Sequence, residues 1–292
     1  MTNGNVGIVH HHAFKCAGST LAWILERNYP GNVLFIEGKG SGDRISCEQV
    51  RPYLASHRYQ AVSSHLLAIP PLGGNIGDLH IALLRAPIDR VLSAYRFQKK
   101  TGDIGGDVSL EAYIETNFQA ENFQAKHASM PDPATGIAGW GLDERVYRKI
   151  ESGELQVGLV EYFDQSMLLL EAEARDRGIP FDGAYPRKIN TTTSSGDPDP
   201  AGAALPDELK ALCAEKNAAD FRLYESVKQR LLPVFSARFG DILYSVRRTR
   251  GLRLRHLADD AMPVRTLRAA EAGKLTLTPD TVTGLAHRYG VE

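Results

Sequence analysis

A short stretch near the N-terminus combines the residue types that bind a phosphate or a similar oxyanion. In HHAFKCAGSTLAWIL (residues 11–25), Lys15 precedes Gly18 by three residues, and Ser19 and Thr20 follow directly. An apolar run precedes this stretch and apolar residues at helical spacing follow it, which predicts a loop between a strand and a helix. Because the first N–H groups of a helix lack partners and the helix dipole attracts anions, the stretch predicts an oxyanion site.

The stretch differs from the two common glycine-rich nucleotide motifs. A Walker A loop carries its lysine directly after its last glycine, and a dinucleotide-binding loop reads G-x-G-x-x-G. Here the lysine comes first and only one glycine follows it before the helix. A plain strand-to-helix turn with an incidental lysine is therefore an alternative, as long as this stretch is considered alone.

A second stretch offers ligands for a second anionic group. In LLRAPIDRVLSAY (residues 83–95), Arg85 ends an apolar run, and Pro87 begins a helix that carries Arg90 and Ser93. Ligands of open α/β sheets bind at the carboxyl ends of the strands, and arginine binds phosphate well. Arg85 and Ser93 are thus candidates for a second phosphate, whereas Arg90 either joins them or lies on a solvated helix face.

Together the two stretches resemble the nucleotide signatures of PAPS-dependent sulfotransferases, where PAPS is 3′-phosphoadenosine 5′-phosphosulfate. HAFKCAGSTL and LLRAPIDRVLSAY are similar to the carbohydrate-type patterns H-I-P-K-x-x-G-[TS]-[ST] and L-R-[DE]-P-x-x-R-x-x-S-x-[YF]. SSHL (63–66) resembles the family's strand-end histidine, and VGLVEYFDQSMLLL (157–170) resembles its V-G-x-x-E-x-[FY] segment. The resemblance covers roughly residues 5–245. Phe14 stands where the family usually has proline, and Ala86 where it usually has an acidic residue. Neither position supplies one of the Lys, Arg or Ser donors to the nucleotide.

The resemblance implies a role for each matching residue. The loop around the 5′-phosphosulfate would consist of Lys15, Cys16, Ala17, Gly18, Ser19, Thr20 and Leu21. Lys15 would neutralise the bridging oxygen as the S–O bond breaks, and Arg85 and Ser93 would hold the 3′-phosphate. His65 would be the general base for an acceptor hydroxyl, or alternatively only a hydrogen-bond donor.

Further residues are candidates for contacts around this site. His12 matches the family's histidine before the lysine and would contact substrate or orient the loop. Segments that would close over the nucleotide or the acceptor contain Glu161, Arg187, Lys188 and Asn190. Cys16 is either a thiol whose pKa a helix N-terminus lowers or a small residue that fills the loop. We expect no metal site at His10–His12, because adjacent strand residues point to opposite faces.

The elements that must position these residues alternate between strand and helix. Strands are expected at 5–9, 33–38, 59–65, 79–87 and 155–163, and helices at 19–28, 46–57, 87–100, 164–178, 207–216 and 218–238, with 109–153 mainly helical. This alternation predicts an α/β fold with a central parallel sheet. The sulfotransferase resemblance implies a P-loop-like, three-layer version of that fold.

The composition is that of an ordinary soluble protein. Of 292 residues, 43% are hydrophobic and 24% charged, and the formal net charge of −1 gives no overall attraction for nucleic acid or anionic membrane. The N-terminus does not resemble a signal peptide, and no apolar run is long enough to span a membrane. Three widely spaced cysteines argue against a disulfide framework, so we expect a cytoplasmic protein.

The composition changes near residue 247, where RRTRGLRLRH begins. We therefore expect a domain over 1–246 and a small helical C-terminal appendage over 247–292. Residues 254–292 resemble the helix-turn-helix domain of Cro/C1-type repressors, with 264–271 as recognition helix and Arg265 and Arg268 as groove contacts. The turn is one residue short and the first helix incomplete, so we favour an appendage that packs on the enzyme and do not expect a nucleic-acid partner. Its buried face would include Leu257, Leu267, Leu275, Val282 and Leu285.

These observations lead to one expected function and two alternatives. We expect transfer of a sulfuryl group from PAPS to a hydroxyl, or an amine, of a carbohydrate-like or small-molecule acceptor, with release of 3′,5′-ADP and no metal. One alternative is a P-loop-like kinase, against which the lysine position and the lack of a clear Walker B aspartate count. The other is a DNA-binding regulator that senses a nucleotide. The sequence indicates neither the acceptor nor the oligomeric state.

Overall fold

The structure is a computed structural model that describes residues 6–37, 45–67, 76–128, 144–185 and 205–290. The chain forms two compact units, Met1–Tyr224 and Glu225–Glu292, which are described separately below. Within the described ranges, no helix is both long enough and apolar enough to cross a membrane.

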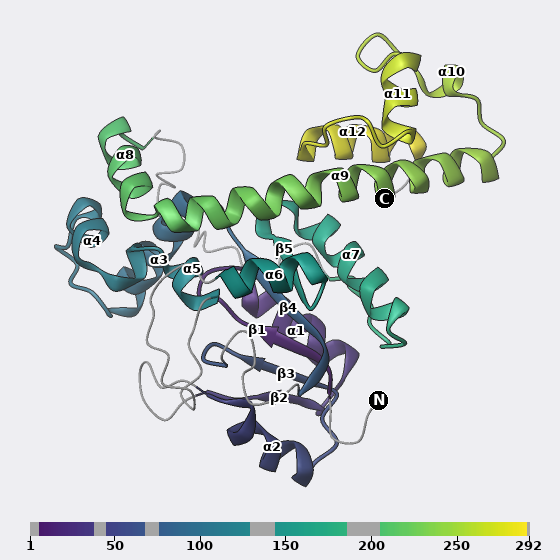
Figure 1. The fold of residues 1–292 in the computed structure, drawn as a ribbon. Coiled ribbons are helices and arrows are strands. Elements are labelled where there is room, and N and C mark those ends of the chain that lie inside the picture. Colours follow the sequence, from purple (N-terminus) through teal and green to yellow (C-terminus); the bar gives the residue numbers. More distant parts are fainter. Residues whose placement is uncertain (1–5, 38–44, 68–75, 129–143, 186–204, 291–292) are drawn as a thin grey trace. The chain divides into compact units, whose positions relative to one another are not determined.

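The first unit is built on a parallel sheet of five strands in the order β2-β3-β1-β4-β5 (Figure 1). The strands are β1 (Val6–His11), β2 (Val33–Phe35), β3 (Ala61–Ser64), β4 (Gly77–Leu84) and β5 (Leu155–Leu159). Every residue of β1 and β3 is buried, as expected for central strands of a parallel sheet with helices on both faces. The expected α/β fold with a central parallel sheet is confirmed.

Helices connect the strands and cover both faces of the sheet. The first unit contains α1 (Gly18–Asn28), α2 (Cys47–Ser56), α3 (Pro87–Thr101), α4 (Leu110–Thr116), α5 (Phe123–Ala128), α6 (Glu144–Ser152), α7 (Phe163–Asp176), α8 (Asp207–Lys216) and the start of α9 (Ala218–Thr249). Local signals explain several of their ends. Ser46 and Gln49 form a capping box at the start of α2, Pro87 occupies the first turn of α3, and Gly102 ends α3 with a φ of 79°.

Two apolar clusters make the unit three-layered. Ile8 of β1 packs in the cluster that includes Leu21 of α1 and Met167 of α7. Val9, the next residue, packs in a different cluster with Val50 of α2. Successive strand residues face opposite sides of a sheet, so these clusters are the cores on its two faces.

Two elements differ most from the sequence-based expectation. β5 ends at Leu159 rather than at residue 163, because its neighbour β4 ends at Leu84, the residue paired with Leu159. Residues Val160–Tyr162 form a short 3-10 helix instead. Helix α9 continues past residue 238 to Thr249, so the compositional change near 247 falls inside its last turn.

The second unit has its own core. It consists of the later part of α9 with α10 (Leu254–Leu257), α11 (Val264–Glu271) and α12 (Pro279–Tyr289). The expected face of Leu257, Leu267, Leu275, Val282 and Leu285 packs with Phe239, Leu243 and Val246 of α9. Helix α11 has the bounds expected for a recognition helix, and both Arg265 and Arg268 on it are exposed.

Candidate functional site

The carboxyl ends of three adjacent strands bring the candidate histidines together. The parallel register pairs His11 of β1 with Ser64 of β3, and Phe35 of β2 with Ser63. The residues that follow these pairs therefore lie side by side at the same edge of the sheet. His12 and His65 meet there with ring centroids 3.7 Å apart.

The loop between β1 and α1 holds an unusual backbone conformation. Lys15 and Ala17 have φ angles of 64° and 57°, in the left-handed region that residues other than glycine seldom adopt. Among the described residues, no acceptor pairs with the backbone N–H groups of Lys15, Ala17, Gly18 or Ser19. Unpaired N–H groups at a helix start, next to residues with positive φ, form a concave site for an anion. Strain of this kind is often kept at functional sites.

Gly18 is required by a side chain of the same loop. A Cβ built on Gly18 would lie 1.7 Å from the His12 ring, so only glycine leaves room for that imidazole. The resemblance placed Gly18 in the phosphosulfate loop, and the structure adds that this glycine accommodates His12.

Two cationic side chains flank the loop. The Lys15 ammonium lies 4.3 Å from the centroid of the Phe97 ring, and burial together with the nearby Arg85 guanidinium lowers the pKa of Lys15. No carboxylate of the described residues lies within ion-pair distance of either cation. Two neighbouring cations without an anionic partner repel each other, and a bound anion would relieve that repulsion.

The backbone at Arg85 and Ala86 is held by the side chains of Gln124 and Glu161. Gln124 accepts the Arg85 N–H at 2.8 Å and donates to the Arg85 carbonyl at 2.8 Å. The same Gln124 carbonyl oxygen accepts the Cys16 thiol at 3.3 Å, which connects the end of β4 to the Lys15 loop. Glu161 accepts the Ala86 N–H at 2.9 Å and the Tyr224 hydroxyl at 2.9 Å. Glu161 therefore supports the Arg85 segment.

Helix α3 places Ser93 and Arg90 differently. Ser93 precedes Phe97 by one helical turn, so it shares the helix face that the Lys15 ammonium contacts. Arg90 is fully buried, donates to the Gln119 carbonyl and lies 5.0 Å from the centroid of the Phe123 ring. A solvated helix-face arginine is thus excluded for Arg90. Its Nε and Nη1 atoms have no partner among the described residues.

The other loop residues differ in what they offer a ligand. Cys16 and Leu21 point into the core, and their N–H groups already donate to the carbonyls of Ala13 and Ala17. Burial raises the pKa of Cys16 to about 12, so the hypothesis of an activated thiol is wrong. Ser19 is exposed and Thr20 half-buried in the first turn of α1. Three weaker candidates lie outside the described residues: Arg187, Lys188 and Asn190.

His65 is held on several sides. Its Nδ1 lies 2.8 Å from Glu37 Oε1, its N–H donates to the same carboxylate, and its carbonyl lies 3.0 Å from His127 Nε2. Burial, together with His65 and His127, lowers the pKa of the adjacent His12 to about 3, so His12 stays neutral at physiological pH. The edge therefore carries one neutral imidazole beside one that contacts a carboxylate.

The remaining histidines of the triplet face opposite sides, as expected. His10 Nδ1 lies 2.9 Å from Ser63 Oγ, whereas His11 Nε2 lies 3.0 Å from His80 Nδ1. In the described part of the chain, no group of three or more His, Cys, Asp and Glu side chains could hold a metal ion.

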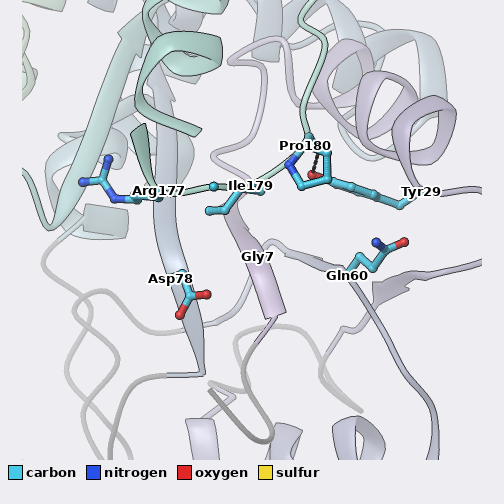
Figure 2. A pocket seen from close by; sticks show the side chains of 8 residues that line it. Gly7, Tyr29, Gln60, Asp78, Arg177, Ile179 and Pro180 are labelled. Carbon is cyan, nitrogen blue, oxygen red and sulfur yellow. Dashed lines mark hydrogen bonds between the residues drawn. The ribbon is translucent and has the colours of Figure 1, made fainter. Parts of the chain in front are cut away.

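A small hollow lies at the opposite, amino edge of the sheet. Figure 2 shows its lining, with Gly7 on β1, Asp78 at the start of β4, and Tyr29, whose hydroxyl donates to the Pro180 carbonyl. Ligands of such sheets bind at the carboxyl ends of the strands, so we assign this hollow no role in the site.

Among solved structures the chain has a distant likeness to a "Sulfotransferase from Alicyclobacillus acidocaldarius", with 15% sequence identity and a TM-score of 0.44. The match covers 77% of this chain and 96% of the other. No family model and no curated protein match.

Sequence reasoning missed two residues of this site. Neither Gln124 nor Glu37 belongs to a recognisable motif. Gln124 contacts Arg85, which lies 39 residues away in the sequence, and Glu37 contacts His65, which lies 28 residues away. The one sequence signal that could have identified Glu37 is its position just after β2, at the carboxyl edge where the site was expected.

Proposed function

We propose that the chain is a PAPS-dependent sulfotransferase whose reaction takes place at the carboxyl edge of the first unit's sheet. One observation carries the proposal: Lys15 and Arg85, two cations without a described anionic partner, flank a helix start with unpaired N–H groups. That arrangement suits a ligand with two separate anionic groups, as PAPS has at its 5′ and 3′ positions. The resemblance of both segments to the PAPS signatures supports the choice of nucleotide.

The 5′-phosphosulfate would lie against the Lys15 loop. When the acceptor oxygen attacks the sulfur, the bond between sulfur and the bridging oxygen breaks, and that oxygen leaves on 3′,5′-ADP with a new negative charge. Lys15 and the N–H groups of Gly18 and Ser19 would stabilise this charge. The 3′-phosphate would bind Arg85 and Ser93, so the backbone bonds from Gln124 set the distance between the two anion subsites.

The acceptor proton requires a base at the same edge. His65 would take the proton of an acceptor hydroxyl on its imidazole as the new O–S bond forms. His65 lies beside His12, which in turn packs over Gly18 of the phosphosulfate loop, so base and leaving group belong to one continuous site. The protein accelerates the reaction mainly by positioning and by electrostatic stabilisation.

A transfer assay tests this function. The full-length protein is incubated with PAPS labelled in its sulfuryl group and with panels of sugars, phenols, alcohols and amines, and labelled products are separated. We expect transfer to at least one hydroxyl or amine and loss of that transfer in Lys15→Ala, whereas Lys100→Ala, an exposed lysine of α3, keeps it. Transfer by Lys15→Ala at the wild-type rate would contradict the proposed role of the loop.

A further inference from the structure

The contact between Glu37 and His65 follows from the strand register. Phe35 pairs with Ser63, so the residues two positions further along, Glu37 and His65, lie opposite each other beyond the paired strands. Glu37 Oε1 lies 2.8 Å from the His65 Nδ1, and Oε1 and Oε2 accept the His65 backbone N–H at 3.2 and 3.3 Å. One carboxylate therefore holds both the backbone and the ring of His65.

The other polar atoms of His65 also have partners, with one exception. The His127 Nε2 lies 3.0 Å from the His65 carbonyl, and the His12 ring packs against the imidazole. Within the described ranges, the ring nitrogen Nε2 of His65 has no hydrogen-bond partner. The ring is thus held through Nδ1, and among its polar atoms in the described part of the chain only Nε2 remains without a partner.

We propose that Glu37 is a positioning residue that selects the tautomer of His65. A carboxylate accepts but does not donate, so the neutral imidazole beside it carries its proton on Nδ1, and Nε2 presents the lone pair. The same carboxylate stabilises the imidazolium that forms once Nε2 has taken a proton. The choice of an acceptor hydroxyl as the source of this proton rests on the proposed function.

A purely structural role of this contact is a poor alternative. The Glu37 and His65 side chains are 50% and 39% exposed, and ion pairs at such positions contribute little to stability. The contact therefore matters mainly because it determines which ring nitrogen of His65 carries the proton. This tautomer can be measured in the protein without ligand.

Long-range ¹H–¹⁵N NMR of the histidine rings in the full-length protein measures the tautomer directly. A His65→Gln variant assigns the signals, and the spectra are recorded at a pH where the ring is neutral. We expect the Nδ1–H form of His65 to predominate by about tenfold or more, as for a charge-assisted hydrogen bond. A predominant Nε2–H form in the wild-type protein would overturn the proposal.

Variants of Glu37 separate positioning from mere proximity. In Glu37→Ala the Nδ1–H preference should disappear, whereas Glu37→Gln, whose amide oxygen can accept the same bond, should retain most of it. Glu48→Ala, at an exposed carboxylate of α2, should leave the His65 signals unchanged. An unchanged tautomer in Glu37→Ala would also overturn the proposal. Because no nucleotide is present, these outcomes are independent of whether PAPS is the substrate.

Discussion

At the residue scale, the sheet buries several histidines in neutral form. His80 of β4 contacts His11 of β1, and burial lowers the pKa of His80 to about 4. Lys149 and Glu154 are the charged groups that also act on it, in opposite directions. Burial likewise lowers the pKa of His10 and His11. A buried polar pair of this kind makes stability depend on pH.

The first prediction follows from the sign of this shift. The unfolded chain protonates His80 near its ordinary pKa of 6.5, whereas the folded chain does so only near 4. Between these pH values the unfolded chain binds a proton that the folded chain does not, so the free energy of unfolding falls as the pH drops from 6.5 to about 4, by at most about 3.4 kcal/mol from this residue. Urea unfolding across this range should show that loss.

A variant assigns this pH dependence to His80. In His80→Gln the free energy of unfolding should depend less steeply on pH between 6.5 and 4, because one titrating group is removed. His57→Gln, at an exposed histidine, should keep the wild-type slope. Equal slopes in all three proteins would show that His80 does not control acid stability.

At the element scale, Gln124 connects two segments that each supply a cation. It bonds to both backbone groups of Arg85 and accepts the thiol of Cys16, while Asp220 caps the start of α5 through the N–H groups of Gln124 and Ala125. The distance between the Lys15 loop and Arg85 thus depends on a short helix that neither segment contains.

Removal of the Gln124 side chain should therefore affect both stability and binding. We expect Gln124→Ala to cost about 2 kcal/mol, because it leaves the Arg85 N–H and carbonyl without partners. Calorimetry should also show weaker binding of 3′,5′-ADP. Gln98→Ala, where the amide oxygen has only a 3.5 Å contact with Asn117, serves as the control. Wild-type affinity in Gln124→Ala would mean that the two segments are positioned independently.

The sequence predicted the helices and strands better than it predicted the residues of the candidate site. Alternating apolar strands and amphipathic helices are local patterns, so helices such as α1 and α11 were predicted nearly to their ends and the five strands to within a few residues. Arg85 was found because it ends a strand pattern, and Lys15 because it lies in a short glycine-containing loop between a strand and a helix. Glu37 and Gln124 were not, because their roles arise from strand register and from a contact 39 residues away. The end predicted for α9 at residue 238 was wrong. The helix continues through Gly240, a residue type that often ends helices, because a glycine there lets α9 pack closely against the Ala270 carbonyl.

At the scale of the whole molecule, the second unit is stabilised within itself. Leu267 of α11 is completely buried among Leu243 of α9 and Leu285 of α12. A Cβ on Gly240 of α9 would lie 2.6 Å from the Ala270 carbonyl oxygen, so α9 and α11 pack backbone to backbone. Arg247 and Glu271 form a two-bond ion pair at 2.5 and 2.7 Å between the same helices.

This organisation predicts separable effects of mutation. Leu267→Ala should destabilise the second unit by about 2–5 kcal/mol through a core cavity, while the affinity for 3′,5′-ADP stays unchanged. Differential scanning calorimetry with and without 3′,5′-ADP measures both. Val234→Ala, at an exposed valine of α9, should change neither. A parallel loss of nucleotide affinity in Leu267→Ala would show that the site depends on the second unit.

The central claim is that Lys15 and Arg85 hold the two anionic ends of one nucleotide. Isothermal titration calorimetry with 3′,5′-ADP and with 5′-AMP tests it, because these ligands differ only in the 3′-phosphate. We expect the wild-type protein to bind 3′,5′-ADP about tenfold more tightly or better, Arg85→Ala and Ser93→Ala to lose much of this preference, and Lys100→Ala to keep it. Equal affinities of the wild-type protein for the two nucleotides would contradict the account.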